Sequence, residues 1–121
     1  MTLISKILIA LVALEHAYIL WLEMFAWTTH GRRTFTSFPP DLFERTKVLA
    51  ANQGLYNGFQ AAGLVWSLCI DDITWSRNVA LFFLICVVIA GIYGGLTASR
   101  SILYKQALPA AVALLVVWLS P

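Results

Sequence analysis

The composition of this 121-residue chain indicates a membrane protein. Hydrophobic residues make up 60% of the sequence and charged residues only 12%, and the mean hydropathy is +0.81. Soluble domains are about half apolar and a quarter charged, so the sequence leaves no room for a soluble domain. The net charge of +2 is too small to indicate nucleic acid binding, and membrane lipids are the expected surroundings.

Four segments are candidates for membrane spans, at residues 4–27, 48–70, 78–98 and 102–119. A spanning helix needs about 20 residues; the fourth segment just suffices if Lys105 extends toward the head groups. A cleavable signal peptide is disfavoured because the apolar run that begins at Ile7 continues past Glu15 as far as Trp27. The sequence therefore predicts an all-α integral membrane protein, a single domain over residues 1–121 that forms an antiparallel, up-down four-helix bundle.

Basic residues predict the orientation of this bundle in a cytoplasmic (inner) membrane. Six of them lie in two loops, and two, Lys6 and Arg77, lie on the opposite side. Because basic loops stay in the cytoplasm, we expect loops 28–47 and 99–105 to be cytoplasmic and both termini to lie outside.

Local signals predict where several helices begin and end. Gly31 can end the first helix in a left-handed cap conformation. Asp41 and Glu44 have the spacing of a capping box, so a helix can start at Asp41 and continue into the second span. Asp72 or Thr74 can cap the third helix.

Small residues predict close helix packing. Gly54 and Gly58 recur four residues apart in the second span, and Gly91 and Gly95 do so in the third. Such ridges let helix backbones approach closely in lipid. They support packing within one chain or self-association into a homo-oligomer, and the sequence does not decide between these. The connection at residues 99–101 is so short that the third and fourth helices must be antiparallel neighbours.

Ionisable residues make the first span marginal on its own. An ionised acid at the centre of a span costs about 2.5–3.5 kcal/mol, whereas each Leu, Ile, Val or Phe contributes only about 0.3–0.6 kcal/mol. The insertion cost of three residues, Glu15, His16 and Glu23, offsets nearly all of the favourable insertion free energy that the apolar residues from Ile7 to Trp27 contribute. The first helix therefore needs polar partners.

The second span supplies candidate partners on one broad face, separate from its small residues: Asn52, Gln53, Tyr56, Asn57 and Gln60. In an antiparallel pair of helices, Glu23 is expected level with Asn52 and Gln53. Glu15 and His16 are expected deeper, level with Asn57 and Gln60. We expect a polar pocket between the two helices. Intramembrane ionisable residues are functional candidates by default.

Acid–base chemistry fits these residue types. Glu23 would donate or accept a proton, His16 would relay it and Glu15 would assist. The ligand, a small lipophilic molecule, would bind to the amides and to the aromatic rings, namely Asn52, Gln53, Tyr56, Asn57 and Trp27.

A metal site is disfavoured, because His16 and Glu23 are about 10 Å apart along the helix and the usual His/Glu spacings are absent. Cys69 and Cys86 have no Cys-x-x-Cys spacing and indicate neither a metal site nor a disulfide. No cofactor is expected.

Two motifs add a family resemblance. EHAYILWLEMFAW (Glu15 to Trp27) and ANQGLYNGFQAAGL (Ala51 to Leu64) resemble the bacterial and fungal family catalogued as domain of unknown function 1304, small integral membrane proteins with four predicted spans. The resemblance extends over essentially the whole chain, and Gln60 stands where an apolar residue is usual in the family. It implies the fold class and the membrane location but no activity.

Whether the chain is an enzyme stays open. The favoured hypothesis is that the chain binds, and in a stronger form also converts, a small lipophilic molecule. It is alternatively a proton-coupled transporter or exporter component, which would need at least a dimer, or a structural or accessory protein in which the polar residues only hold two helices together.

Overall fold

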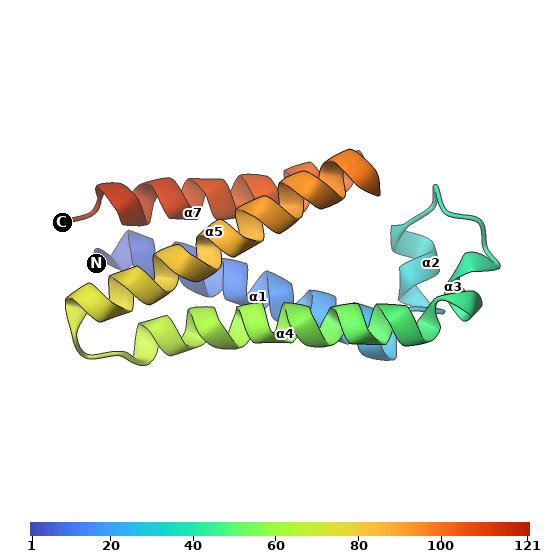
Figure 1. Cartoon of the computed structure of the whole chain (residues 1–121), viewed down its shortest axis with the longest axis horizontal. Coiled ribbons are helices and arrows are strands. Elements are labelled where there is room, and N and C mark those ends of the chain that lie inside the picture. Colours follow the sequence, from blue (N-terminus) through green and yellow to red (C-terminus); the bar gives the residue numbers. More distant parts are fainter. The chain divides into compact units, whose positions relative to one another are not determined.

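The computed structural model describes all residues from Met1 to Pro121, and every regular element is helical (Figure 1). The elements are α1 (Leu3–Phe25), α2 (His30–Thr34), α3 (Leu42–Arg45), α4 (Lys47–Cys69), α5 (Ile73–Thr97), α6 (Arg100–Ile102), the π-helical turn η1 (Leu103–Ala107) and α7 (Leu108–Leu119). The all-α fold class is therefore confirmed.

Three helical segments are long and apolar enough to cross a membrane: Leu3–Phe25, Ile73–Thr97 and Arg100–Leu119. They correspond to the first, third and fourth expected spans, although the third begins five residues earlier than expected, at Ile73 rather than residue 78. The earlier start follows from Asp72, whose carboxylate accepts a hydrogen bond of 2.9 Å from the backbone N–H of Trp75. The predicted cap at Asp72 is confirmed. The second expected span corresponds to α4. This helix has 23 residues, as many as α1, but it contains the polar amides and is not one of the three apolar segments.

Packing divides the chain into two compact units, one of Met1–Leu14 with Gln60–Pro121 and the other of Glu15–Phe59. The helices α1 and α4 each contribute one half to each unit. The first unit contains the apolar core, and the second contains the predicted site residues other than Gln60.

In the first unit, apolar residues of all four long helices form one core. Its fully buried members are Ile9, Val12, Ala13, Leu64, Ala80, Leu84, Val87, Ala110, Ala113 and Val117. The α5 glycines permit the close approach of the following helix, because a Cβ at Gly91 would lie 2.7 Å from the backbone N of Ala107 and one at Gly95 would lie 2.7 Å from Leu103 Cβ. As residue numbers rise along α5, the numbers of the residues that face them on the next segment fall. The two segments are therefore antiparallel neighbours, as predicted (Figure 1).

A second feature of the first unit is a pair of hydrogen bonds formed by buried serines. The hydroxyls of Ser5 and Ser120 share a hydrogen bond of 2.6 Å, and Ser76 donates to the carbonyl of Ser67 at 2.7 Å. Each of these serines is at least 93% buried. Because buried polar groups need partners, these bonds tie α1 to the end of α7 and α4 to α5.

The helical connection α2–α3 belongs to the second unit and differs from the expectations for residues 28–47. Helix α1 ends at Phe25, and Gly31 lies inside α2 without a positive φ, so the predicted left-handed cap at Gly31 is wrong. Asp41 precedes α3 but caps nothing, because its carboxylate pairs with Arg45 at 3.1 Å instead. The predicted capping box is therefore wrong too, and Thr46 separates α3 from α4.

Candidate functional site

The centre of the candidate site is a hydrogen bond between the acid of one helix and an amide of another. Asn57 Nδ2, on α4, donates to Glu23 Oε1, on α1, at 2.6 Å. The same Nδ2 lies 3.1 Å from the carbonyl oxygen of Gln53, one turn earlier on its own helix. Both side chains are half-buried. The bond uses only one carboxyl oxygen, so Glu23 Oε2 remains available to another group.

Gly54 explains how the two helices come close enough for this bond. A Cβ at Gly54 would lie 2.8 Å from Met24 Cγ, 3.0 Å from Glu23 Cβ and 3.1 Å from the carbonyl oxygen of Leu20. Only a residue without a side chain leaves room there. Gly54 and Gly58 therefore pack against α1 of their own chain, and self-association through the glycines stays an untested prediction.

At Glu23 the register of the two helices is close to the predicted one, but the hydrogen-bond partner differs. The sequence placed Glu23 level with Asn52 and Gln53, and its Cβ lies beside Gly54, the next residue, whereas its carboxyl group bonds Asn57 about one turn further along α4. Asn57 therefore lies on the side of α4 that carries Gly54, which the sequence had assigned to a separate face.

The other two ionisable residues of α1 do not join this hydrogen bond. His16 is 2% exposed and lies two turns from Glu23, about 10 Å along the axis. Glu15 is half-buried on the shoulder of the helix. The predicted set Glu23, His16 and Glu15 thus occupies one half-helix without forming a single cluster.

The remaining predicted amides and Tyr56 are exposed. Gln53 is about 40° around α4 from Asn57 and one turn away, so its side chain can reach the same region. Asn52 and Tyr56 lie further round the helix, and Tyr56 is 63% exposed with its ring edge-on to Phe59 at 5.7 Å. Within the predicted ligand-binding set, only Asn57 therefore contacts Glu23.

Gln60 belongs to the other unit, where its Oε1 is buried without a hydrogen-bond partner.

Trp27 is the base of an aromatic cluster. Its Nε1 donates to Thr46 Oγ1 at 3.0 Å, and its ring lies 5.6 Å from that of Phe35 and 5.1 Å from that of Phe43. Phe43 is 1% exposed, so the connection between α1 and α4 has its own small core. Trp27 is thus held by the loop rather than directed at Glu23.

Sequence reasoning did not predict this cluster. The signal was present in the spacing of four aromatic rings, Trp27, Phe35, Phe38 and Phe43, over 17 residues.

A carboxyl group with one oxygen held by an amide can bind or exchange a proton with a hydrogen-bonding ligand. No group of three or more His, Cys, Asp or Glu side chains has the geometry to hold a metal ion.

Residues 10–118 match the family described as "Protein of unknown function (DUF1304)". The chain belongs to this family. The resemblance carried by its two motifs is thereby confirmed, and both motifs lie inside the matched range. Among curated proteins, this DUF1304 member is 32% identical over 117 residues to the uncharacterized protein YpaA of Lactococcus lactis subsp. lactis, covering 95% of this chain and 97% of YpaA. No solved structure matches the DUF1304 chain.

Proposed function

We propose that this protein binds a small lipophilic molecule within the membrane and that Glu23 and Asn57 hold the polar group of that molecule. The observation that carries the proposal is the 2.6 Å bond between Asn57 Nδ2 and Glu23 Oε1, which orients the carboxyl group and leaves Oε2 available. Gln53, exposed and one turn from Asn57, is the next candidate contact.

The surroundings of the pair support a ligand that is mainly apolar. Leu20 and Met24 border the glycine next to Glu23, and the exposed side chains nearby include Trp21 and Phe25. An acid in such an environment costs several kcal/mol unless it is paired. If helix contact were its only role, Ser or Asn at position 23 would provide it at lower cost.

A stronger form of the proposal adds chemistry. Glu23 would then donate or accept a proton on the bound molecule, with His16 and Glu15 as further members of the set. Because His16 lies two turns away, a relay between His16 and Glu23 requires the ligand or a water molecule to bridge them.

We further propose that all four long helices cross a cytoplasmic membrane as one domain, with loops 28–47 and 99–105 cytoplasmic and both termini outside. The three apolar helical segments support this arrangement. The length of α4, 23 residues, is sufficient for a fourth span.

The binding proposal is tested by identifying the molecules that co-purify with the chain. Wild type and variants are extracted from their own membranes in mild detergent, and bound small molecules are identified by mass spectrometry. A hydrogen bond to a charged group contributes about 1.5–3 kcal/mol, so Glu23→Gln and Asn57→Leu should lose roughly tenfold or more of the bound molecule.

Asn52→Leu is the matched control. It repeats the change of Asn57→Leu on the same helix, at an exposed position that does not form the bond, and it should retain the molecule. If wild type and Glu23→Gln carry the same molecules in the same amounts, the binding proposal is wrong and the pair serves only to join two helices.

A further inference from the structure

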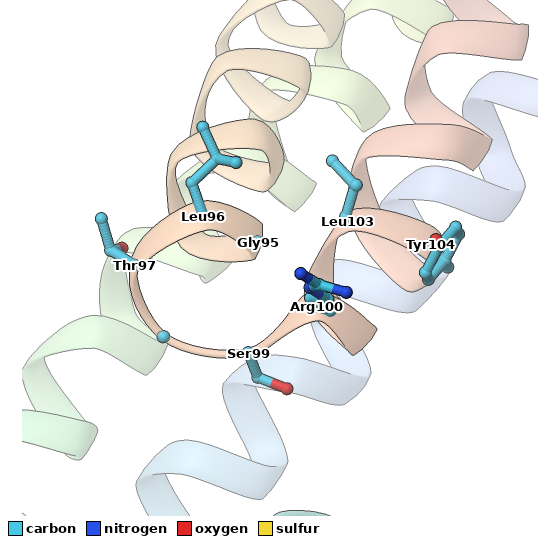
Figure 2. Close-up of a pocket in the computed structure, with 8 residues that line it drawn as sticks. Gly95, Leu96, Thr97, Ser99, Arg100, Leu103 and Tyr104 are labelled. Atoms are coloured by element: carbon cyan, nitrogen blue, oxygen red, sulfur yellow. The ribbon is translucent and has the colours of Figure 1, made fainter.

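A second candidate site lies in the first unit, at the turn between α5 and α6. A surface cavity of about 440 Å³ opens there, and Figure 2 shows its lining side chains around the turn. They come from the end of α5 and the beginning of the next helix: Gly95, Leu96, Thr97, Ala98, Ser99, Arg100, Leu103 and Tyr104. The proposed function does not use this cavity.

Arg100 gives the cavity a positive charge that nothing in the chain neutralises. No Asp or Glu occurs anywhere between Ile73 and Pro121, whereas Arg77, Arg100 and Lys105 do. The ion pair in the structure joins Arg45 to Asp41 in the other unit. Arg100 therefore has no acidic partner in this part of the chain, and its exposed guanidinium can pair with an external anion.

The hydrogen bonds of the lining define the donors that remain. Thr97 Oγ1 donates to the carbonyl of Tyr93 at 2.7 Å, and Ser99 Oγ is 2.9 Å from Ser101 Oγ. Both hydroxyls therefore form hydrogen bonds within this part of the chain. The guanidinium of Arg100 and the phenol of Tyr104, four residues apart on one helix side, are the donors left for a ligand.

Phosphate is the anion that matches these donors. A guanidinium binds phosphate oxygens through two parallel N–H groups, and a tyrosine hydroxyl can donate a third hydrogen bond. Leu96 and Leu103 line the same cavity and offer apolar surface beside the charge. Both flanking helices are long and apolar enough to cross a membrane, so the turn lies at the depth of lipid head groups if they do.

We propose that the cavity at the α5–α6 turn binds a phosphate group through Arg100 and Tyr104. The phosphate belongs either to the head group of an anionic lipid or to a soluble phosphate, and the same two donors serve both.

The test compares three variants of the purified full-length chain in neutral detergent. Phosphatidylglycerol is added in one arm and inorganic phosphate in the other, and the bound fraction is measured by native mass spectrometry. Arg100→Gln should weaken binding about tenfold. Arg100→Lys keeps the charge but loses the paired N–H groups, so it should weaken binding several-fold as well.

Lys105→Gln is the matched control, because Lys105 carries the same charge on the same segment, is exposed and does not line the cavity. It should bind nearly as wild type does. Arg100-dependent binding of phosphatidylglycerol alone assigns the site to a lipid head group, and Arg100-dependent binding of inorganic phosphate assigns it to a soluble ligand. Equal losses in Arg100→Gln and Lys105→Gln, or no loss in Arg100→Lys, would overturn the site in favour of diffuse attraction. Thermal unfolding of each variant should show an unchanged fold, as expected for an exposed side chain.

Discussion

Replacing Gly54 with alanine tests whether this glycine sets the distance between α1 and α4. The added Cβ would lie 3.0 Å from Glu23 Cβ and 3.1 Å from the carbonyl oxygen of Leu20, where ordinary contact begins at 3.4 Å, so the helices must separate by about 0.4 Å. Met24 Cγ, at 2.8 Å, can rotate away, but a backbone carbonyl and Glu23 Cβ cannot. The separation would lengthen the 2.6 Å bond between Asn57 and Glu23 to roughly 3.0 Å, still a normal hydrogen bond.

The expected loss of stability follows from two opposing effects. Overpacking a close contact costs about 1–3 kcal/mol, and replacing a mid-helix glycine by alanine returns about 0.5–1 kcal/mol. Gly54→Ala should therefore lower the free energy of unfolding by about 0–2.5 kcal/mol and keep the Asn57–Glu23 pair.

Gly58→Ala is the matched control one turn further along. Its Cβ would meet the terminal Cδ1 of Leu20, a flexible side chain, and the next atom lies at an ordinary 3.6 Å. Its stability should stay within about 0.5 kcal/mol of wild type. Unfolding by SDS in mixed micelles, followed by the fluorescence of the five tryptophans, measures both values. Equal effects of the two substitutions, or stabilisation by Gly54→Ala, would refute the argument.

Three further changes have defined outcomes. Ser5→Ala removes the 2.6 Å bond to Ser120, but Ser120 still donates to a carbonyl at 2.7 Å, so SDS unfolding should show a loss of only about 0.6 kcal/mol; a loss above about 2 kcal/mol would contradict this accounting. Trp27→Phe keeps the ring and removes the N–H that binds Thr46, so the same assay should show a loss of about 0.5–1.5 kcal/mol, and no measurable loss would mean that the bond does not hold the loop. Cys69 is exposed at the end of α4, so in a variant without the other cysteine a membrane-impermeant maleimide should label it in intact cells; labelling only in inverted vesicles would reverse the proposed orientation.

The helices were predictable because lipid solubility leaves a strong signal in sequence. Long apolar runs with few charges mark α1, α5 and the segment Arg100–Leu119, and each is helical as expected. Their ends were less predictable. The start of α5 depends on one side-chain bond at Asp72, and η1 interrupts the last segment just before Pro109, which lacks the N–H that an α-helix needs at that point.

The candidate site was predictable in its members but not in its pairing. A polar residue in an apolar span is costly wherever it points, so the sequence identified Glu23 and the amides of α4. It could not tell Asn57, which contacts Glu23, from Asn52, which is exposed.

Composition by itself determined that this chain is helical and suited to a membrane, and two motifs determined its family. The choice among several amides on one helix was made only by the tertiary structure. The reason is geometric: the register of α1 against α4 depends on where the backbones can touch, and that contact is set by the missing side chain at Gly54 together with the folded connection anchored by Trp27. The recurrence of Gly54 and Gly58 predicts a close contact but does not identify the residues of α1 that meet it, because those residues lie far away in the chain.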